Sequence, residues 1–126
     1  MIKPEDLRIG NWVEHYGETI TVDGIDDIDV FNKKCGEIPL HSITPIPLTE
    51  KILMDCGFEN KRGCFNLDRS EQLGHNFGDF AVSVYDITQI KFWRGDRYCG
   101  VVHCQYLHEL QNLFYALTKT ELIIKL

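Results

Sequence analysis

Hydrophobic and polar residues recur with a helical period in residues 105–118. Leu107, Leu110, Phe114 and Leu117 are spaced by three or four positions. This spacing places apolar side chains on one face of an α-helix. The pattern therefore predicts an amphipathic helix over residues 105–118 whose apolar face packs on a core.

The opposite face of this predicted helix carries a polar stripe formed by His108, Gln111, Asn112 and Tyr115. At about 100° per residue these positions lie above one another. Their amide, imidazole and phenol groups donate and accept hydrogen bonds. Lysine and glutamate would be the commoner choices for solubility alone, so we expect this stripe to be exposed and to contact a ligand. The alternative that stays open is an ordinary solvated helix face.

Residues 1–48 predict a β-rich lobe. Residues 19–22 alternate β-branched and apolar side chains, as strands do, and glycines at 17, 24 and 36 separate the short runs. Short strands joined by glycine turns suggest a small, strongly bent sheet of the SH3-like kind. Such a fold assigns no function by itself.

Residues 49–126 predict an α+β lobe, and we expect both lobes to form one compact unit. Thr49 is a suitable N-cap for a helix over residues 49–56, and Gly57 is a suitable terminator. Strands are expected at residues 64–67, 80–85, 87–93 and 98–104, with a loop over residues 68–78. After the last helix, alternation over residues 121–126 predicts a final strand.

A predicted hairpin around residues 94–96 brings aromatic and cationic residues together. Trp93 and Tyr98 lie beside Arg94 and Arg97, a set able to stack on a base and hold a phosphate. The alternative is a cross-strand aromatic pair with solvated charges at the turn. We carry all four residues forward as candidate ligand-binding positions.

Composition narrows the function classes. The chain has 126 residues, 44% of them hydrophobic, and a formal net charge of −6. An acidic chain is poorly suited to non-specific nucleic-acid binding, which requires a basic surface. The sequence contains no run long enough to predict a membrane span, and its start lacks the apolar run of a signal peptide, so we expect a cytoplasmic protein with reduced cysteines.

Motifs for metal binding or catalysis are absent from the sequence. Cys99, His103, Cys104 and His108 cluster, but their spacing matches no zinc pattern. No nucleophile elbow, phosphate loop or His-Glu-x-x-His motif occurs. We therefore expect no metal, no cofactor and no enzymatic activity, with a small hydrolase as the weakest alternative.

Three segments resemble a family of small proteins encoded by gut anaerobic bacteria and their phages, for which no activity is established. The segments are Leu-Arg-Ile-Gly-Asn-Trp-Val at 7–13, Pro-Leu-Thr-Glu-Lys-Ile-Leu-Met-Asp-Cys-Gly-Phe at 47–58, and Tyr-Leu-His-Glu-Leu-Gln-Asn-Leu-Phe-Tyr-Ala-Leu-Thr at 106–118. The resemblance implies an origin in a phage or mobile element. In the family pattern a glycine follows the last helix, where this chain has Lys119.

These observations together predict a non-catalytic binding protein. We expect it to engage a host protein or to sequester a small polar, nucleotide-like ligand through the polar helix face and the 93–98 hairpin. A homodimer fits a module of this size. The alternative is a pure protein–protein interaction or structural module without a small-molecule ligand.

Overall fold

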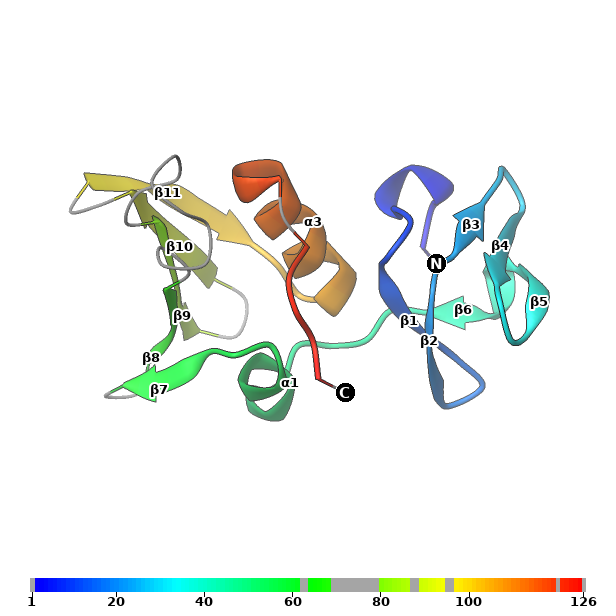
Figure 1. Cartoon of the computed structure of the whole chain (residues 1–126), viewed down its shortest axis with the longest axis horizontal. Coiled ribbons are helices and arrows are strands. Elements are labelled where there is room, and N and C mark those ends of the chain that lie inside the picture. The colour runs from blue at the N-terminus through cyan, green and yellow to red at the C-terminus, as the bar shows by residue number, and fades with distance from the viewer. Residues whose placement is uncertain are drawn as a thin grey trace. The chain divides into compact units, whose positions relative to one another are not determined.

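The computed structural model describes residues 2–61, 64–68, 80–86, 89–94, 97–119 and 121–125. Of these, residues 59–61, 64–68, 80–86, 89–94, 97–99, 101, 117 and 118 are described by their backbone alone. The chain divides into two compact units. Unit 1 comprises Met1–Pro47 and Tyr106–Asn112, and unit 2 comprises Leu48–Gln105 and Leu113–Leu126. Figure 1 labels the elements of both units.

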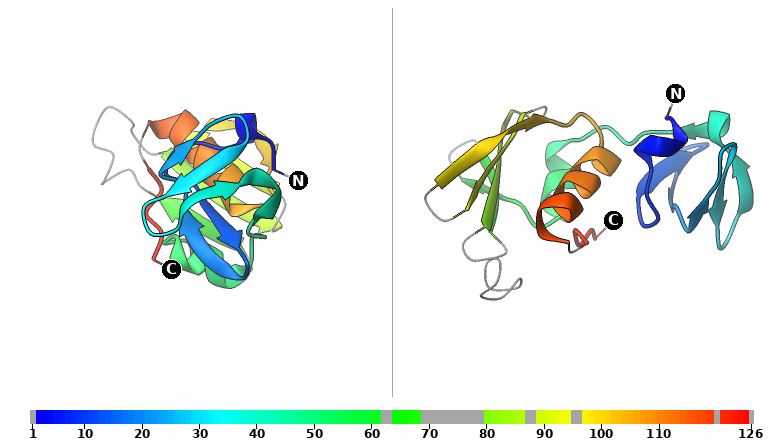
Figure 2. Two further views of the ribbon diagram at one scale, coloured as in Figure 1. Left: turned by 90° about the vertical axis from the view of Figure 1, so that its right-hand side faces the viewer. Right: turned by 90° about the horizontal axis from the view of Figure 1, so that it is seen from above.

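Unit 1 contains short antiparallel strands in two three-stranded sheets. One sheet has the order β2–β1–β6, formed by Glu18–Thr21, Trp12–His15 and Ile43–Thr44. The other has the order β3–β4–β5, formed by Gly24–Ile25, Asp29–Asn32 and Gly36–Pro39. Two 3₁₀ helices, η1 (Pro4–Asp6) and η2 (Leu40–Ser42), also belong to the unit. Figures 1 and 2 show the two sheets side by side.

The two sheets of unit 1 share one hydrophobic core. Val13 of β1 and Val30 of β4 are both completely buried in it. Its other members are Ile2, Leu7, Ile20, Val22, Ile38, Leu40 and Ile43. Burial of this apolar set is the main stabilising contribution to the unit.

Turns in unit 1 are set by residues able to adopt unusual backbone angles or to bond the backbone. Tyr16 (φ 49°) and Gly17 (φ 81°) form the two-residue turn between β1 and β2, where two positive φ angles match the twist of a hairpin. In the turn after β4, the Asn32 Oδ1 atom accepts hydrogen bonds from the Lys34 and Cys35 N–H groups. Asn32 Nδ2 donates to the Thr21 carbonyl and so ties this turn to β2.

Helix α1 spans Glu50–Asp55 and has the caps expected from the sequence. The Thr49 hydroxyl accepts a hydrogen bond from the Ile52 N–H at 3.2 Å. Gly57 adopts a φ of 93°, and the Gly57 and Phe58 N–H groups donate to the carbonyls of Met54 and Leu53. This pair of bonds is a Schellman motif, which requires the left-handed conformation that glycine adopts without strain.

Unit 2 contains an antiparallel sheet with the order β11–β10–β9–β8–β7 in the described residues. The strands are Glu59–Lys61 (β7), Cys64–Asp68 (β8), Phe80–Asp86 (β9), Gln89–Arg94 (β10) and Arg97–His103 (β11). Strands β8 to β11 confirm the four predicted runs, and β7 is an additional strand. Apart from Asp68, the predicted loop over residues 68–78 lies outside the described residues. The mixed α+β class is confirmed.

The prediction of a final strand is wrong. Residues 121–125 adopt no regular structure and pair with no described strand. Leu122 is 5% exposed and Ile123 is 55% exposed, so the predicted alternation is real. However, the Lys125 N–H donates to the carbonyl of Asp55, the last residue of α1. Carbonyls at a helix C-terminus have no partner within the helix. The Asp55 carbonyl therefore accepts from Lys125, whose N–H would bond a neighbouring strand if residues 121–126 formed one.

Helix α3 spans Leu107–Thr118 and ends at a left-handed residue. Lys119 has a φ of 56° and its N–H donates to the Tyr115 carbonyl at 2.7 Å. A side chain with a Cβ atom is strained in this conformation, in which glycine is not. Lys119 therefore occupies a glycine-type helix terminus without glycine's conformational freedom.

We expect Lys119→Gly to raise the free energy of unfolding by about 1 kcal/mol, because it removes the strain of a left-handed non-glycine residue. Chemical denaturation measures the change. Lys119→Ala is the matched control, since it removes the same side chain but keeps the Cβ atom, and it should bring no gain. An equal gain in both variants would mean that the lysine side chain, not the backbone, carries the strain.

Candidate functional site

The first turn of helix α3 is held by its own third residue. Tyr106 precedes the helix, and its N–H donates to the Glu109 Oε1 atom at 3.1 Å. The Leu107 N–H donates to the Ile46 carbonyl at 2.8 Å. The first bond is half of a capping box, in which a glutamate at the third helical position reaches back to the N-cap. Tyr106 and Glu109 are thereby fixed relative to each other at the start of the helix.

Gln111, on the second turn of α3, docks on the backbone of unit 1. Its Oε1 atom accepts from the Trp12 N–H at 2.8 Å, and its Nε2 atom donates to the Gly10 carbonyl at 3.1 Å. The side chain is 1% exposed. A carboxamide that bonds the carbonyl of one residue and the N–H two residues later imitates the edge of a neighbouring β-strand. The Gly10 carbonyl and the Trp12 N–H thus obtain hydrogen-bond partners from a side chain.

Asn112 extends this polar contact to the first residues of the chain. Its Oδ1 atom accepts from Asn11 Nδ2 at 2.8 Å and from Arg8 Nε at 3.3 Å, and its Nδ2 atom donates to the Asp6 carbonyl at 3.0 Å. Asn11 is completely buried, and its Oδ1 accepts from the Arg8 N–H at 2.7 Å. Buried amides satisfied in this way contribute stability because losing either partner strands the other.

The expected solvent exposure of the polar helix stripe is therefore wrong for its first two members. His108 is 4% exposed and Gln111 is 1% exposed, Asn112 is half-buried, and Tyr115 is 38% exposed. Leu107 and Leu110 on the apolar face are buried as well. The reason is that residues 6–12 are largely irregular and carry backbone groups without sheet partners, which side-chain amides satisfy. Gln111 and Asn112 act in folding through these bonds.

His108 differs from its neighbours because a buried atom of its ring lacks a partner. Among the described residues, Nδ1 makes no hydrogen bond although it is shielded from solvent. The ring stacks on Tyr106, with centroids 6.0 Å apart and planes inclined by 12°. Buried polar atoms without partners are rare in folded proteins, and each calls for an explanation.

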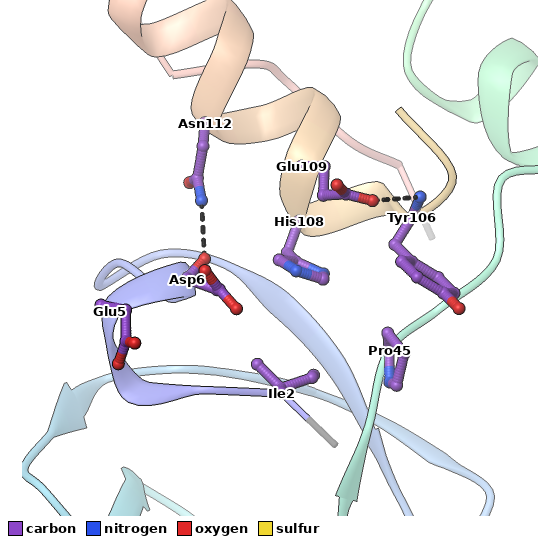
Figure 3. Close-up of a pocket in the computed structure, with 8 residues that line it drawn as sticks. All are labelled: Ile2, Glu5, Asp6, Pro45, Tyr106, His108, Glu109 and Asn112. Atoms are coloured by element: carbon purple, nitrogen blue, oxygen red, sulfur yellow. Dashed lines mark hydrogen bonds between the residues drawn. The ribbon is translucent and has the colours of Figure 1, made fainter. Parts of the chain in front are cut away.

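A hollow of about 480 Å³ opens beside this imidazole. Figure 3 shows the side chains around it. The lining residues are Ile2, Glu5, Asp6, Pro45, Tyr106, His108, Glu109 and Asn112. Three of these eight carry carboxylates and none is a lysine or an arginine. All eight belong to unit 1. We call this feature the His108 hollow.

Burial favours the neutral form of the His108 imidazole against the charges of the hollow. Burial lowers the pKa of His108, and the carboxylates of Glu109 and then Asp6 oppose this by a smaller amount. A neutral imidazole has one N–H and one acceptor nitrogen. The hollow therefore combines negative charge at Glu5, Asp6 and Glu109 with an uncharged ring.

A second hollow of about 480 Å³ lies on the outer side of β2 and the turn after β4. It is lined by Trp12, Glu18, Thr19, Ile20, Thr21, Asp23, Asn32, Lys33, Lys34 and Cys35. Its lining includes both acidic residues, Glu18 and Asp23, and basic residues, Lys33 and Lys34. Unlike the first hollow, it includes no side-chain atom identified as buried and unpartnered.

The hairpin candidates belong to unit 2 and are described by their backbone. Trp93 pairs with Tyr98, and Arg94 with Arg97, at the end of β10 and the start of β11. This register agrees with the expected hairpin, while Gly95 and Asp96 and the side chains of all four candidates lie outside the described residues. Their role in binding stays a prediction. Of the helix candidates, His108 and Asn112 are brought together in the hollow, and Gln111 and Tyr115 do not line it.

Sequence reasoning missed most of the residues that line the hollow. Ile2, Glu5, Asp6, Pro45, Tyr106 and Glu109 were not candidates. A glutamate three positions after Tyr106 is a capping signal that places Glu109 on the first turn. Nothing in the sequence alone indicates that Glu5 and Asp6 approach this turn from the other end of the chain.

Comparisons with family models, curated proteins and solved structures find no match for this chain. Within the described residues, no cluster of three or more His, Cys, Asp and Glu residues is arranged to hold a metal ion. In that same part of the chain, no helix has the length and apolar character needed to cross a membrane.

We expect Gln111→Met to lower the free energy of unfolding by about 2–6 kcal/mol. The substitution keeps the shape but leaves the Trp12 N–H and the Gly10 carbonyl without partners, at about 1–3 kcal/mol for each buried group. Denaturation compared with Leu110→Met provides the control. That neighbouring change preserves volume and should stay below about 1.5 kcal/mol. Equal losses in the two variants would show that packing, not hydrogen bonding, holds this turn.

We expect the free energy of unfolding to decrease as the pH falls below about 6.5, the ordinary pKa of histidine. Since burial lowers the pKa of folded His108, the unfolded chain binds its proton first and gains stability relative to the folded one. The loss levels off below the folded pKa. The carboxylates of Glu109 and Asp6 act on the ring and Tyr106 stacks on it, and all three are unchanged in the variant. Denaturation at several pH values, with His108→Phe as control, should show a shallower slope in the variant.

Proposed function

We propose that this chain is a non-catalytic binding protein and that the His108 hollow receives a group of its ligand. The observation that carries the proposal is the Nδ1 atom of His108, which is buried and unpartnered beside a hollow of about 480 Å³. A polar atom in this state lowers stability by about 1–3 kcal/mol. Residues that reduce stability without local compensation are typical of binding sites.

The chemistry of the lining favours binding over catalysis. The eight lining residues offer no Ser, Thr, Cys or Lys as a nucleophile. Their aliphatic, aromatic and amide groups suit the recognition of a bound group. The carboxylates of Glu5, Asp6 and Glu109 repel phosphate, which moves the balance from a nucleotide-like ligand towards a protein partner at this site.

The architecture of unit 1 supports an SH3-like barrel as the scaffold of this binding module. Its short antiparallel strands are strongly segmented, and the 3₁₀ helix η2 precedes the last strand, β6. The resemblance to proteins of gut anaerobes and their phages supports a partner of host origin and a cytoplasmic location. The fold analogy adds no ligand by itself, so the hollow remains the basis of the proposal.

We expect His108→Phe to raise the free energy of unfolding by about 1 kcal/mol, because phenylalanine keeps the ring contact with Tyr106 and removes the unpartnered nitrogen. His41→Phe is the matched control, since His41 is an exposed residue of unit 1 outside the hollow. The control should change stability by less than about 0.5 kcal/mol. A loss of stability in His108→Phe alone would show that the imidazole has a structural partner, and would remove the basis for a ligand site.

A ligand screen by thermal shift completes the test. Nucleotides, cyclic dinucleotides and amines are added to the wild type, to His108→Phe and to His41→Phe. A ligand at 100 times its Kd adds about 2.7 kcal/mol of stability. We expect a ligand of the hollow to stabilise the wild type and His41→Phe but not His108→Phe. Equal responses from all three proteins would place binding elsewhere on the chain.

A further inference from the structure

Three of the residues that line the His108 hollow are acidic and none is basic. The cation described next to it is Arg8, whose Nε atom donates to Oδ1 of the lining residue Asn112 at 3.3 Å. Glu5 and Asp6 are exposed at η1, and Glu109 is half-buried on α3. The carboxylate of Asp6 has no ion-pair or hydrogen-bond partner in the described residues. Like charges gathered around one cavity repel one another and are stabilised when a cation enters. Acidic residues are common on protein surfaces, however, so the charge pattern alone does not identify a binding site.

The imidazole supplies an independent indication of the same ligand chemistry. Nδ1 of His108 is shielded, unpartnered and part of the ring that lines the hollow (Figure 3). In a neutral imidazole one nitrogen carries the proton and donates a hydrogen bond. The other nitrogen is an acceptor and needs an N–H or O–H group as its partner. Cationic nitrogen groups are donors without acceptor capacity. They match the negative charge of the hollow, and they match the missing hydrogen bond of Nδ1 in the tautomer that carries its proton on Nε2.

We propose that the His108 hollow binds a protonated amine or guanidinium group, carried by a basic side chain of a partner protein. The inference rests on the proposed function and names its ligand class. In this arrangement the carboxylates of Asp6 and Glu5 attract the cation, the imidazole of His108 accepts one of its N–H groups, and the rings of Tyr106 and His108 cover its alkyl stem. A metal ion does not fit, because the described residues hold no suitable ligand cluster.

The size of the hollow agrees with this class of ligand. About 480 Å³ lies within the range of small-ligand sites and accommodates one long basic side chain. A single side chain offers few contacts, so affinity for an isolated group should be in about the millimolar range. The full partner would add further contacts outside the hollow.

NMR titration of the ¹⁵N-labelled full chain tests the inference. The probes are the peptides acetyl-Gly-Arg-Gly-amide and acetyl-Gly-Lys-Gly-amide, the uncharged analogue acetyl-Gly-citrulline-Gly-amide, the free amine spermidine, and AMP. We expect the arginine or lysine peptide to shift the backbone amides of Asp6, His108 and Glu109. The ring nitrogen signal of His108 should also move, because it reports directly on a new hydrogen bond. Raising the salt concentration should weaken the binding.

Variants separate the charge effect from unrelated changes. Asp6→Asn keeps the backbone carbonyl that Asn112 bonds. It should lower the affinity for the basic peptide by roughly fivefold, which is the upper range for an exposed ion pair. Glu37→Gln is the matched control, because it removes one exposed carboxylate of unit 1 outside the hollow. This control should leave the affinity unchanged. Equal weakening in both variants would indicate attraction to the overall negative charge only and would overturn the site assignment.

The probes distinguish the possible failures. Binding of spermidine without binding of either basic peptide would assign the hollow to a free amine. It would overturn the proposal that a side chain of a partner protein carries the cation. Equal binding of the citrulline and arginine peptides would overturn the need for charge. Binding of AMP without the basic peptides would overturn the cationic ligand class yet leave the proposed binding function standing. Absence of shifts at these amides with every probe would overturn the inference, while the His108→Phe stability test still decides the proposed function independently.

Discussion

Two hydrogen bonds from the Gln111 side chain join helix α3 to the backbone of Gly10 and Trp12. Beside them, Asn112 bonds to Asn11 and to the Asp6 carbonyl. These bonds connect segments about a hundred residues apart in the sequence. The Gln111 and Asn11 side chains that take part are buried, so water does not readily replace a lost partner there. Tyr106–Asn112 consequently belong to the same compact unit as the first strands.

The position of the His108 hollow follows from this attachment. His108 lies three residues before Gln111, close to one turn of the helix, and Asn112 holds the carbonyl of Asp6 against the same stretch of α3. Docking of the helix therefore brings the carboxylates of η1 towards an imidazole that the same docking removes from solvent (Figure 3). Gln111 and His108 are thus neighbours on one helix with different roles. Gln111 bonds the backbone of unit 1, whereas His108 is proposed to contact a ligand.

Hydrogen bonding divides the polar stripe into two kinds of residue. The amides of Gln111 and Asn112 have protein partners, and their contribution to stability explains their presence on a helix without reference to a ligand. Nδ1 of His108 has none in the described residues, and burial further lowers the pKa of the ring. A stabilising role accounts for Gln111 and Asn112 but not for His108. The functional proposal is therefore based on the His108 hollow and not on the whole polar stripe.

Local order in this protein was determined by the sequence itself. Periodicity located α3 within two residues at its start, Thr49 and Gly57 located α1, and alternating runs located β8 to β11, because these signals act over one or two turns of chain. Tertiary structure decided the rest. It buried Gln111 against residues 10–12, brought Glu5 and Asp6 to the hollow beside His108, and gave the Lys125 N–H a helix carbonyl in place of a strand. Each of these outcomes depends on a partner distant in the sequence, and periodicity within one segment carries no information about such a partner.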